Sequence, residues 1–270
     1  MIGLEDLLAV ARAAAAEGGR LLSTSGPGNV QTKGDRDFVT DLDLRIQRSI
    51  REYLGRAAPH IGFLGEEQEP NAPEHDAPEL RWVLDPIDGT SNFIHGIPLC
   101  AVSLALTRHD APILGVITAP FLNLEYYAIA GQGAFCNDHR IKASDTQSLS
   151  HAIVSIGDYA VGNNASVKNR HRLALTTALA AEVERVRMFG SAALDLAWVA
   201  EGRTDACVLL SNKPWDMSAG VVIAREGGAH VTDSDGQHHD ARSAHTVAAA
   251  PGVSAALLDL VGTALTDSDR

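Results

Sequence analysis

The chain has little cysteine, and its cysteines are poorly placed for their two common structural roles. The 270 residues include only Cys100, Cys136 and Cys207, which lie far apart, and no CxxC pair is present. An odd number of widely separated thiols fits neither the spacing of a zinc site nor the pairing of a disulfide framework. We therefore expect three reduced, buried thiols.

Basic residues are also scarce. Lysine and arginine number 22 against 34 aspartates and glutamates, so the formal net charge is −12 with the 11 histidines counted as neutral. Binding to a nucleic-acid backbone depends on clustered positive charge, so this composition argues against direct nucleic-acid binding. The same acidic field repels phosphate esters, and bound cations are the usual remedy for an acidic protein that handles them.

The sequence has no hydrophobic run long enough to cross a bilayer. Its longest apolar stretch, residues 7–16, is interrupted by Arg12 and is far shorter than the roughly 20 residues that a transmembrane helix needs. The first residues, MIGLEDLLAV, carry acids where a secretory signal has a positive segment. We expect no membrane partner, no export signal and a cytoplasmic location.

Helix-like and strand-like segments alternate along the chain, and the apolar fraction is 45%. This pattern is typical of a layered α/β or α+β architecture with a large core. Four successive strand-like segments indicate an antiparallel meander, which differs from a simple Rossmann sheet. These segments are residues 81–84, 101–107, 113–118 and 125–130.

Helices and further strands are expected around this meander. Thr40 can N-cap a helix with Asp41 and Asp43 in its first turn, and Gly55 marks its expected end. Other expected helices are residues 4–22, 168–182, 191–200, 217–225 and 253–265, and other extended segments are residues 61–64, 151–157, 183–188, 205–210, 229–232 and 245–250.

A polar, turn-rich stretch at residues 142–150 marks a weak boundary in the chain. We divide the chain there into an N-terminal lobe, residues 1–147, and a C-terminal lobe, residues 148–270. The two lobes are expected to form one catalytic unit.

The strongest chemical signal is the DPIDGT segment at residues 85–90. The proline favours an extended Asp85 at the strand tip, and a turn after it can bring the carboxylates of Asp85 and Asp88 to one side. The carbonyl of Ile87 offers a third oxygen, and Gly89 lets the backbone approach a ligand closely. These hard oxygen ligands suit Mg²⁺. A plain turn, with an aspartate cap and a glycine bend, explains the segment equally well when it is taken alone.

Two further acids stand where they could complete such a site. Glu66 follows the extended segment 61–64, and Asp216 opens an otherwise apolar helix. Taken alone, Glu66 reads as a solvated surface acid, and Asp216 reads as a helix N-cap that contributes about 1 kcal/mol. An N-cap role does not prevent Asp216 from reaching a metal ion.

Several blocks of the sequence resemble the inositol monophosphatase family, whose members are lithium-sensitive, metal-dependent phosphatases. They are DPIDGTSNFIHGIP at 85–98, GEE at 65–67, WDMSAG at 215–220, KGDRDFVTDLD at 33–43 and the pair Gly190-Ser191. The likeness covers almost the whole chain. It implies a five-layer αβαβα sandwich, a phosphoric monoester hydrolase and a homodimer.

The resemblance also implies the roles of individual residues. Two or three Mg²⁺ ions would be bound by Glu66, Asp85, the Ile87 carbonyl, Asp88 and Asp216. Thr90, paired with Asp43, would orient and help deprotonate a metal-bound water, with Glu66 also counted as catalytic. The phosphate and the alcohol would be held by Asp88, Gly89, Thr90, Ser91, Gly190, Ser191 and Ala192.

The default substrate implied by the family is inositol 1-phosphate, a small phosphorylated polyol. Inositol-specific members often carry a glutamate seven residues before the motif aspartate, and Leu209 stands there in this chain, which argues for broader specificity. Fructose 1,6-bisphosphate, histidinol phosphate and a nucleotide 3′-phosphate are the alternatives. An additional regulatory role as a protein partner is a further alternative. Gln47, where many relatives have glutamate, is expected to alter only contacts around the site.

The remaining polar candidates receive simpler interpretations. Lys33 and Arg36 lie in a glycine-containing loop that forms either a flap over the site or a solvated hairpin, and the family likeness favours the flap. His95 is expected to be structural or to lie at the substrate entrance. His238 and His239 are expected to be exposed in a polar turn.

Overall fold

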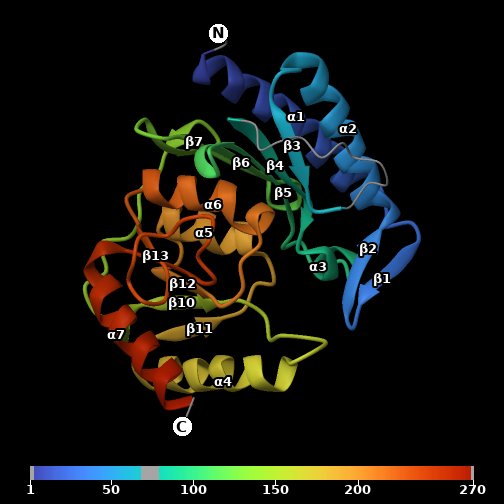
Figure 1. The fold of residues 1–270 in the computed structure, drawn as a ribbon. Coiled ribbons are helices and arrows are strands. Elements are labelled where there is room, and N and C mark those ends of the chain that lie inside the picture. Colours follow the sequence, from blue (N-terminus) through green and yellow to red (C-terminus); the bar gives the residue numbers. More distant parts are fainter. Residues whose placement is uncertain (1–2, 68–78, 269–270) are drawn as a thin grey trace.

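Two β-sheets alternate with three layers of helices (Figure 1). The structure, a computed structural model, describes residues 3–67 and 79–268. Helices α1 and α2 cover one face of a seven-stranded sheet, α5 and α6 lie between the two sheets, and α4 and α7 cover the outer face of a five-stranded sheet. This arrangement confirms the expected αβαβα sandwich. The helices are α1 (Leu4–Thr24), α2 (Asp41–Ala57), α3 (Thr90–Ile94), α4 (Ala165–Glu182), α5 (Ala192–Glu201), α6 (Pro214–Glu226) and α7 (Pro251–Ser268).

The seven-stranded sheet contains the expected meander. From β4 to β9 each strand pairs antiparallel with the next, while β3 pairs parallel with β4 at the edge. Strands β8 and β9 extend the meander beyond the segments expected from the sequence. The strands are β3 (Gly62–Gly65), β4 (Leu80–Asp88), β5 (Ala101–Arg108), β6 (Ala111–Ala119), β7 (Leu124–Ile129), β8 (Gly133–Cys136) and β9 (His139–Arg140).

The five-stranded sheet is mixed, with the order β11-β10-β12-β14-β13. Its second strand, β10, pairs parallel with both β11 and β12, so the carboxyl ends of these three strands lie at one edge. The strands are β10 (Ile153–Ile156), β11 (Arg185–Arg187), β12 (Ala206–Leu209), β13 (His230–Thr232) and β14 (Thr246–Ala249). The seven-stranded sheet ends at residue 140 and the five-stranded sheet begins at residue 153. The division into lobes 1–147 and 148–270 stays a prediction.

Helix α6 is held tightly in the middle of the sandwich. A Cβ atom added at Gly115 of β6 would lie 2.6 Å from the carbonyl oxygen of Ala219 in α6. On an adjacent face of the helix, a Cβ atom added at Gly220 would lie 2.5 Å from Leu196 of α5. Glycine is therefore needed at both positions for the backbone to approach its neighbours. This packing fixes the position of Asp216, which lies in the first turn of α6.

Most helix boundaries match the sequence, but Gly55 does not end its helix. Thr40 accepts hydrogen bonds from the backbone N–H groups of Leu42 and Asp43, as expected of an N-cap, whereas α2 continues to Ala57. Gly55 tolerates a helical conformation because it costs only about 1 kcal/mol relative to alanine inside a helix. The three cysteines are free and buried, as expected. Among the helices of the described residues, none is both long and apolar enough to cross a bilayer.

Candidate active site

The DPIDGT segment brings its two aspartates together through a β-bulge. Asp85 pairs with Ser103 and Asp88 pairs with Ala101, so β4 contains one residue more than β5 across this interval. Residues three apart on a regular strand point to opposite faces, and one extra residue brings them to the same face. The sequence correctly predicted this juxtaposition but attributed it to a turn, whereas the strand continues to Asp88.

The carboxylate of Asp88 is anchored by the N-terminus of α5. It accepts hydrogen bonds from the backbone N–H groups of Ala192 at 3.2 Å and Ala193 at 2.9 Å, and a short one from the hydroxyl of Ser191. Unpaired N–H groups and the helix dipole favour a negative charge at this end of a helix. Burial nevertheless raises the pKa of Asp88 to about 6.

Four carboxylates from separate parts of the chain influence one another electrostatically. Burial raises the pKa of Asp85 well above its usual value, and the charges of Glu66, Asp88 and Asp216 raise it further. Burial likewise raises the pKa of Asp216, with contributions from Asp88 and Glu66. Such mutual repulsion in a desolvated site is relieved by bound cations.

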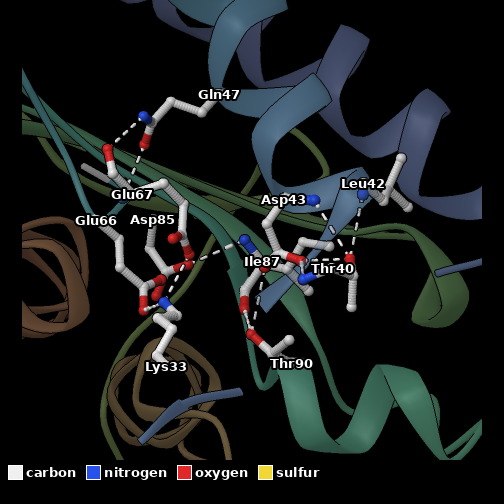
Figure 2. A network of polar contacts seen from close by, with 10 residues as sticks. All are labelled: Lys33, Thr40, Leu42, Asp43, Gln47, Glu66, Glu67, Asp85, Ile87 and Thr90. Carbon is white, nitrogen blue, oxygen red and sulfur yellow. Dashed lines mark hydrogen bonds and ion pairs between the residues drawn. The ribbon is translucent and has the colours of Figure 1, made fainter. Parts of the chain in front are cut away.

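Lys33 is a cation that contacts this group (Figure 2). Its ammonium donates to Glu66 at 2.8 Å and to Glu67 at 2.6 Å. Burial lowers the pKa of Lys33, but these two hydrogen bonds outweigh burial and leave the pKa raised overall. Lys33 belongs to the hairpin of β1 (Val30–Gly34) and β2 (Asp37–Thr40). The sequence allowed either a flap over the site or a solvated hairpin here. The structure shows a hairpin, and its lysine reaches the acidic site.

Gln47 fixes the backbone next to Glu66. Its side-chain amide donates to the carbonyl of Glu67 at 2.7 Å, and its oxygen accepts from the Glu67 N–H at 3.1 Å. The buried side chain thereby imitates a neighbouring strand (Figure 2). A carboxylate at this position has no proton to donate to the carbonyl.

Thr90 lies between the Ile87 carbonyl and Asp43, and only the pairing with Asp43 was implied by the sequence resemblance. Its hydroxyl donates to the carbonyl oxygen of Ile87 at 2.9 Å, and Asp43 Oδ1 lies 3.4 Å away (Figure 2). Asp43 is fully buried and accepts from the backbone N–H and hydroxyl of Thr40. A carbonyl oxygen has two lone pairs, so the Ile87 carbonyl keeps one for another partner.

Gly89 is required by both conformation and space. Its φ of 88° lies in the left-handed region, and an added Cβ atom would lie 2.7 Å from the carbonyl oxygen of Leu99. The next residues form α3, and Asn92 of this helix donates to the carbonyls of Leu99 at 2.8 Å and Phe189 at 2.7 Å. Asn92 thus joins the DPIDGT region to the segment before α5, a contact that sequence reasoning missed.

A cavity of about 410 Å³ opens beside these carboxylates. We call it the Leu209 pocket. It brings together five residues named from the sequence as substrate, metal or specificity positions: Gly190, Ser191, Ala192, Leu209 and Asp216. Asp158, Lys168, Arg172 and Lys213, which the sequence did not single out for this site, also line the pocket.

The carboxylates and the Ile87 carbonyl form a donor set of hard oxygens, which fits Mg²⁺ or Ca²⁺. Within residues 3–67 and 79–268, however, no three histidine, cysteine, aspartate or glutamate side chains already form a metal-binding cluster. Lys33 bonds to Glu66, and Asp88 bonds to the start of α5. A metal ion here would compete with Lys33 for Glu66 Oε1 or bind Glu66 through its other oxygen.

The structure tests the expectations for His95, His238 and His239. His95 is exposed and its Nδ1 lies 2.8 Å from the carbonyl oxygen of Ser91, which fits a structural role at the end of α3. The expectation for His239 was wrong, because this residue is only 6% exposed. Its Nε2 contacts the hydroxyl of Thr246 at 2.8 Å, and Arg225 donates to its backbone carbonyl. His238 is exposed, as expected.

Comparison with known proteins agrees with this architecture. A model described as the inositol monophosphatase family matches residues 3–265. The chain is 38% identical over 264 residues to an inositol-1-monophosphatase of Mesorhizobium japonicum, covering 94% of this chain and 96% of the relative. It is 36% identical over 242 residues to a fructose-1,6-bisphosphatase/inositol-1-monophosphatase of Aquifex aeolicus, covering 86% and 87%. The solved structure of Thermotoga maritima IMPase matches with a TM-score of 0.87 at 32% identity, over 97% of this chain and 99% of that chain.

The layered fold and these relatives define the class of protein as a phosphoric monoester hydrolase. More particularly, the chain belongs to the inositol monophosphatase family, whose phosphatases are metal-dependent.

Proposed function

We propose that the protein hydrolyses phosphate monoesters of small polyols with Mg²⁺, and that inositol 1-phosphate is a substrate. The observation that carries the proposal is the convergence of Glu66, Asp85, Asp88 and Asp216, from three separate segments, on one desolvated site. The metal ions, two or three in number, would supply charge neutralisation and an acidified water. Glu66, Asp85, Asp88, Asp216 and the Ile87 carbonyl would hold them.

The chain's own residues provide positioning and proton handling. The Thr90 hydroxyl, held between Asp43 and the Ile87 carbonyl, orients the attacking water and passes its proton toward Asp43. Gly89, Thr90 and Ser91 receive the phosphate oxygens, with Glu66 beside the nucleophile. In phosphoryl transfer most of the catalysis comes from such positioning and from charge stabilisation. Neither a cysteine nor a serine nucleophile is required.

A panel of phosphorylated substrates tests this function. Purified protein is assayed for phosphate release from inositol 1-phosphate, fructose 1,6-bisphosphate, histidinol phosphate and a nucleotide 3′-phosphate, with Mg²⁺ and with or without Li⁺. We expect Mg²⁺-dependent release from inositol 1-phosphate that Li⁺ inhibits. Release from none of the four would reject the phosphatase function and favour a regulatory binding role. Cytoplasmic location stays a prediction.

We also propose a homodimer. The exposed large apolar side chains include Ile97 at 45%, Met188 at 41% and Phe121 at 40%. Phe121 stacks on Phe93 of α3, and the hydrogen bond from Asn92 to the carbonyl of Phe189 holds the same helix against the segment next to Met188. Light scattering on the purified protein should give twice the 28.5 kDa mass of the chain, and a monomer mass would reject the dimer.

A further inference from the structure

The Leu209 pocket needs a polar group that can recognise an alcohol, and Leu209 cannot supply it. Leu209 is 3% exposed and has a hydrocarbon side chain. A pocket that binds hydroxyls selectively does so through acceptors and donors placed on its wall. The question is which other side chain in the pocket can accept hydrogen bonds from a polyol.

Asp158 enters the pocket from the strand next to Leu209. Strand β10 pairs parallel with β12, with Ile156 opposite Val208, and the N–H of Gly157 donates to the carbonyl of Val208 at 3.2 Å. The next residue along the chain, Asp158, therefore leaves the sheet beside the end of β12. Because the strands are parallel, residues just after their carboxyl ends share one edge of the sheet.

The carboxylate of Asp158 has no protein partner. Within the described part of the chain, its side chain makes neither a hydrogen bond nor an ion pair, although it lines the pocket. By surface area the residue is exposed, because the pocket is open, yet the surrounding protein is dense enough for burial to raise the pKa of Asp158. A partly desolvated carboxylate without a donor gains from a ligand that brings one.

Arg172 holds the backbone around Asp158 in place. Its buried guanidinium donates to the carbonyls of Asp158 at 3.0 Å, Leu210 at 3.1 Å and Lys168 at 3.3 Å. One rigid side chain thereby links the ends of β10 and β12 to α4. The position of Asp158 on the pocket wall is consequently set by a planar, five-donor group that loses little freedom in binding.

The charges around the pocket favour a neutral ligand. Lys168 and Lys213 also line it, and neither side-chain ammonium makes a hydrogen bond or ion pair with the described residues. These lysines repel a cationic leaving group, whereas the carboxylates of Asp37, Asp158 and Asp216, which also line the pocket, oppose a second phosphate that the lysines would otherwise attract. A neutral polyol avoids both penalties and can donate two adjacent hydroxyls to the two carboxylate oxygens.

We propose that Asp158 is a specificity-determining residue that binds the hydroxyls of the leaving alcohol in the pocket where Leu209 offers no hydrogen bond. This inference rests on the proposed phosphatase function and narrows its substrate class to monophosphates of neutral polyols with adjacent hydroxyls. Asp158 acts on the alcohol and takes no part in the chemistry at phosphorus.

The test compares two substrates in one set of variants. Phosphate release with Mg²⁺ is measured from inositol 1-phosphate and from phenyl phosphate, whose leaving group lacks aliphatic hydroxyls, for wild type, Asp158→Asn, Asp158→Ala and Asp158→Glu. Asp145→Asn is the matched control, because the Asp145 side chain is 83% exposed and forms a surface pair with Lys142. Melting curves establish that each variant is folded.

We expect Asp158→Asn and Asp158→Ala to lower kcat/KM for inositol 1-phosphate about 10- to 100-fold, the usual effect of losing a hydrogen bond to a charged group. Their kcat/KM for phenyl phosphate should stay within about twofold of wild type, and Asp158→Glu should recover part of the loss. An equal loss on both substrates, or no loss on either, would overturn the role of Asp158. A wild-type protein inactive on both substrates would instead reject the proposed function, and the role of Asp158 with it.

Discussion

The close packing of α6 against the seven-stranded sheet predicts a specific cost for Gly115→Ala. The new Cβ atom would lie 2.6 Å from the carbonyl oxygen of Ala219, 2.9 Å from its Cα atom and 2.8 Å from Cγ1 of Val222. Ordinary contacts begin at 3.4 Å, so α6 would have to withdraw by roughly 0.5–0.8 Å to restore them. Helix backbone cannot rotate away as a flexible side chain can.

Movement of α6 is also limited by its close packing against α5. The α-carbon of Gly220 faces Leu196 of α5 with no room for a methyl group, and Gly227 similarly faces the carbonyl of Ala200. Overpacking of this kind costs about 1–3 kcal/mol, partly offset by about 0.4–1 kcal/mol because alanine restricts the unfolded chain. We therefore expect a net loss of about 1–2 kcal/mol in the free energy of unfolding.

Urea denaturation followed by circular dichroism measures this loss, and Gly55→Ala is the matched control. Nothing lies within 4 Å of the Cβ atom added at Gly55 of α2, so the control should gain about 0.5–1 kcal/mol from helix propensity. Because α6 carries Asp216, Gly115→Ala should also reduce Mg²⁺-dependent phosphate release, by up to about 100-fold if Asp216 moves by 1 Å. A Gly115→Ala protein as stable as wild type would refute the idea that α6 is confined.

Two other substitutions give predictions of opposite pH dependence. Gln47→Glu should lower the free energy of unfolding by about 1–3 kcal/mol at neutral pH, because a carboxylate cannot donate to the Glu67 carbonyl. Burial would raise the pKa of the new glutamate, so this loss should shrink as pH falls toward 4. A loss that grows on acidification in urea melts would contradict this. For His239, burial lowers the pKa from 6.5 to about 4. Between pH 6.5 and 4 the unfolded chain therefore binds more protons than the folded chain, and the free energy of unfolding falls by up to about 3 kcal/mol as pH drops through this window. His239→Gln should show a flatter stability profile from pH 6.5 to 4, and an unchanged slope would exclude His239 as the cause.

The sequence predicted most helices and strands well because these follow local rules, whereas the αβαβα layering was implied by the family resemblance. Alternating strands and capped helices have local signals, and Thr40 caps α2 as its position suggests. The DPIDGT segment likewise predicted that Asp85 and Asp88 would face one side. Its sequence could not distinguish a turn from a bulge, since the bulge is defined by pairing with Ser103 and Ala101 of another strand.

The features that the sequence did not predict depend on residues distant in the chain. Lys33 pairs with Glu66 across 33 positions, and His239 is buried through its contacts with Thr246 and Arg225. No local pattern distinguishes such a histidine from one in a solvated turn. Asp158 was likewise overlooked because its place beside Leu209 follows only from the parallel pairing of β10 with β12.

The most direct test of the proposed metal site is the Mg²⁺ dependence of phosphate release from inositol 1-phosphate by wild type and Asp216→Asn. Asp216 comes from α6, whereas Asp85 and Asp88 come from β4, so the variant removes one carboxylate while leaving the bulge intact. The substitution also removes a repelled, half-buried charge and should not unfold the protein. We predict saturable Mg²⁺ activation of wild type and a loss of nearly all activity in Asp216→Asn at every Mg²⁺ concentration. Near-normal, Mg²⁺-dependent turnover by the folded variant would contradict the proposed metal site.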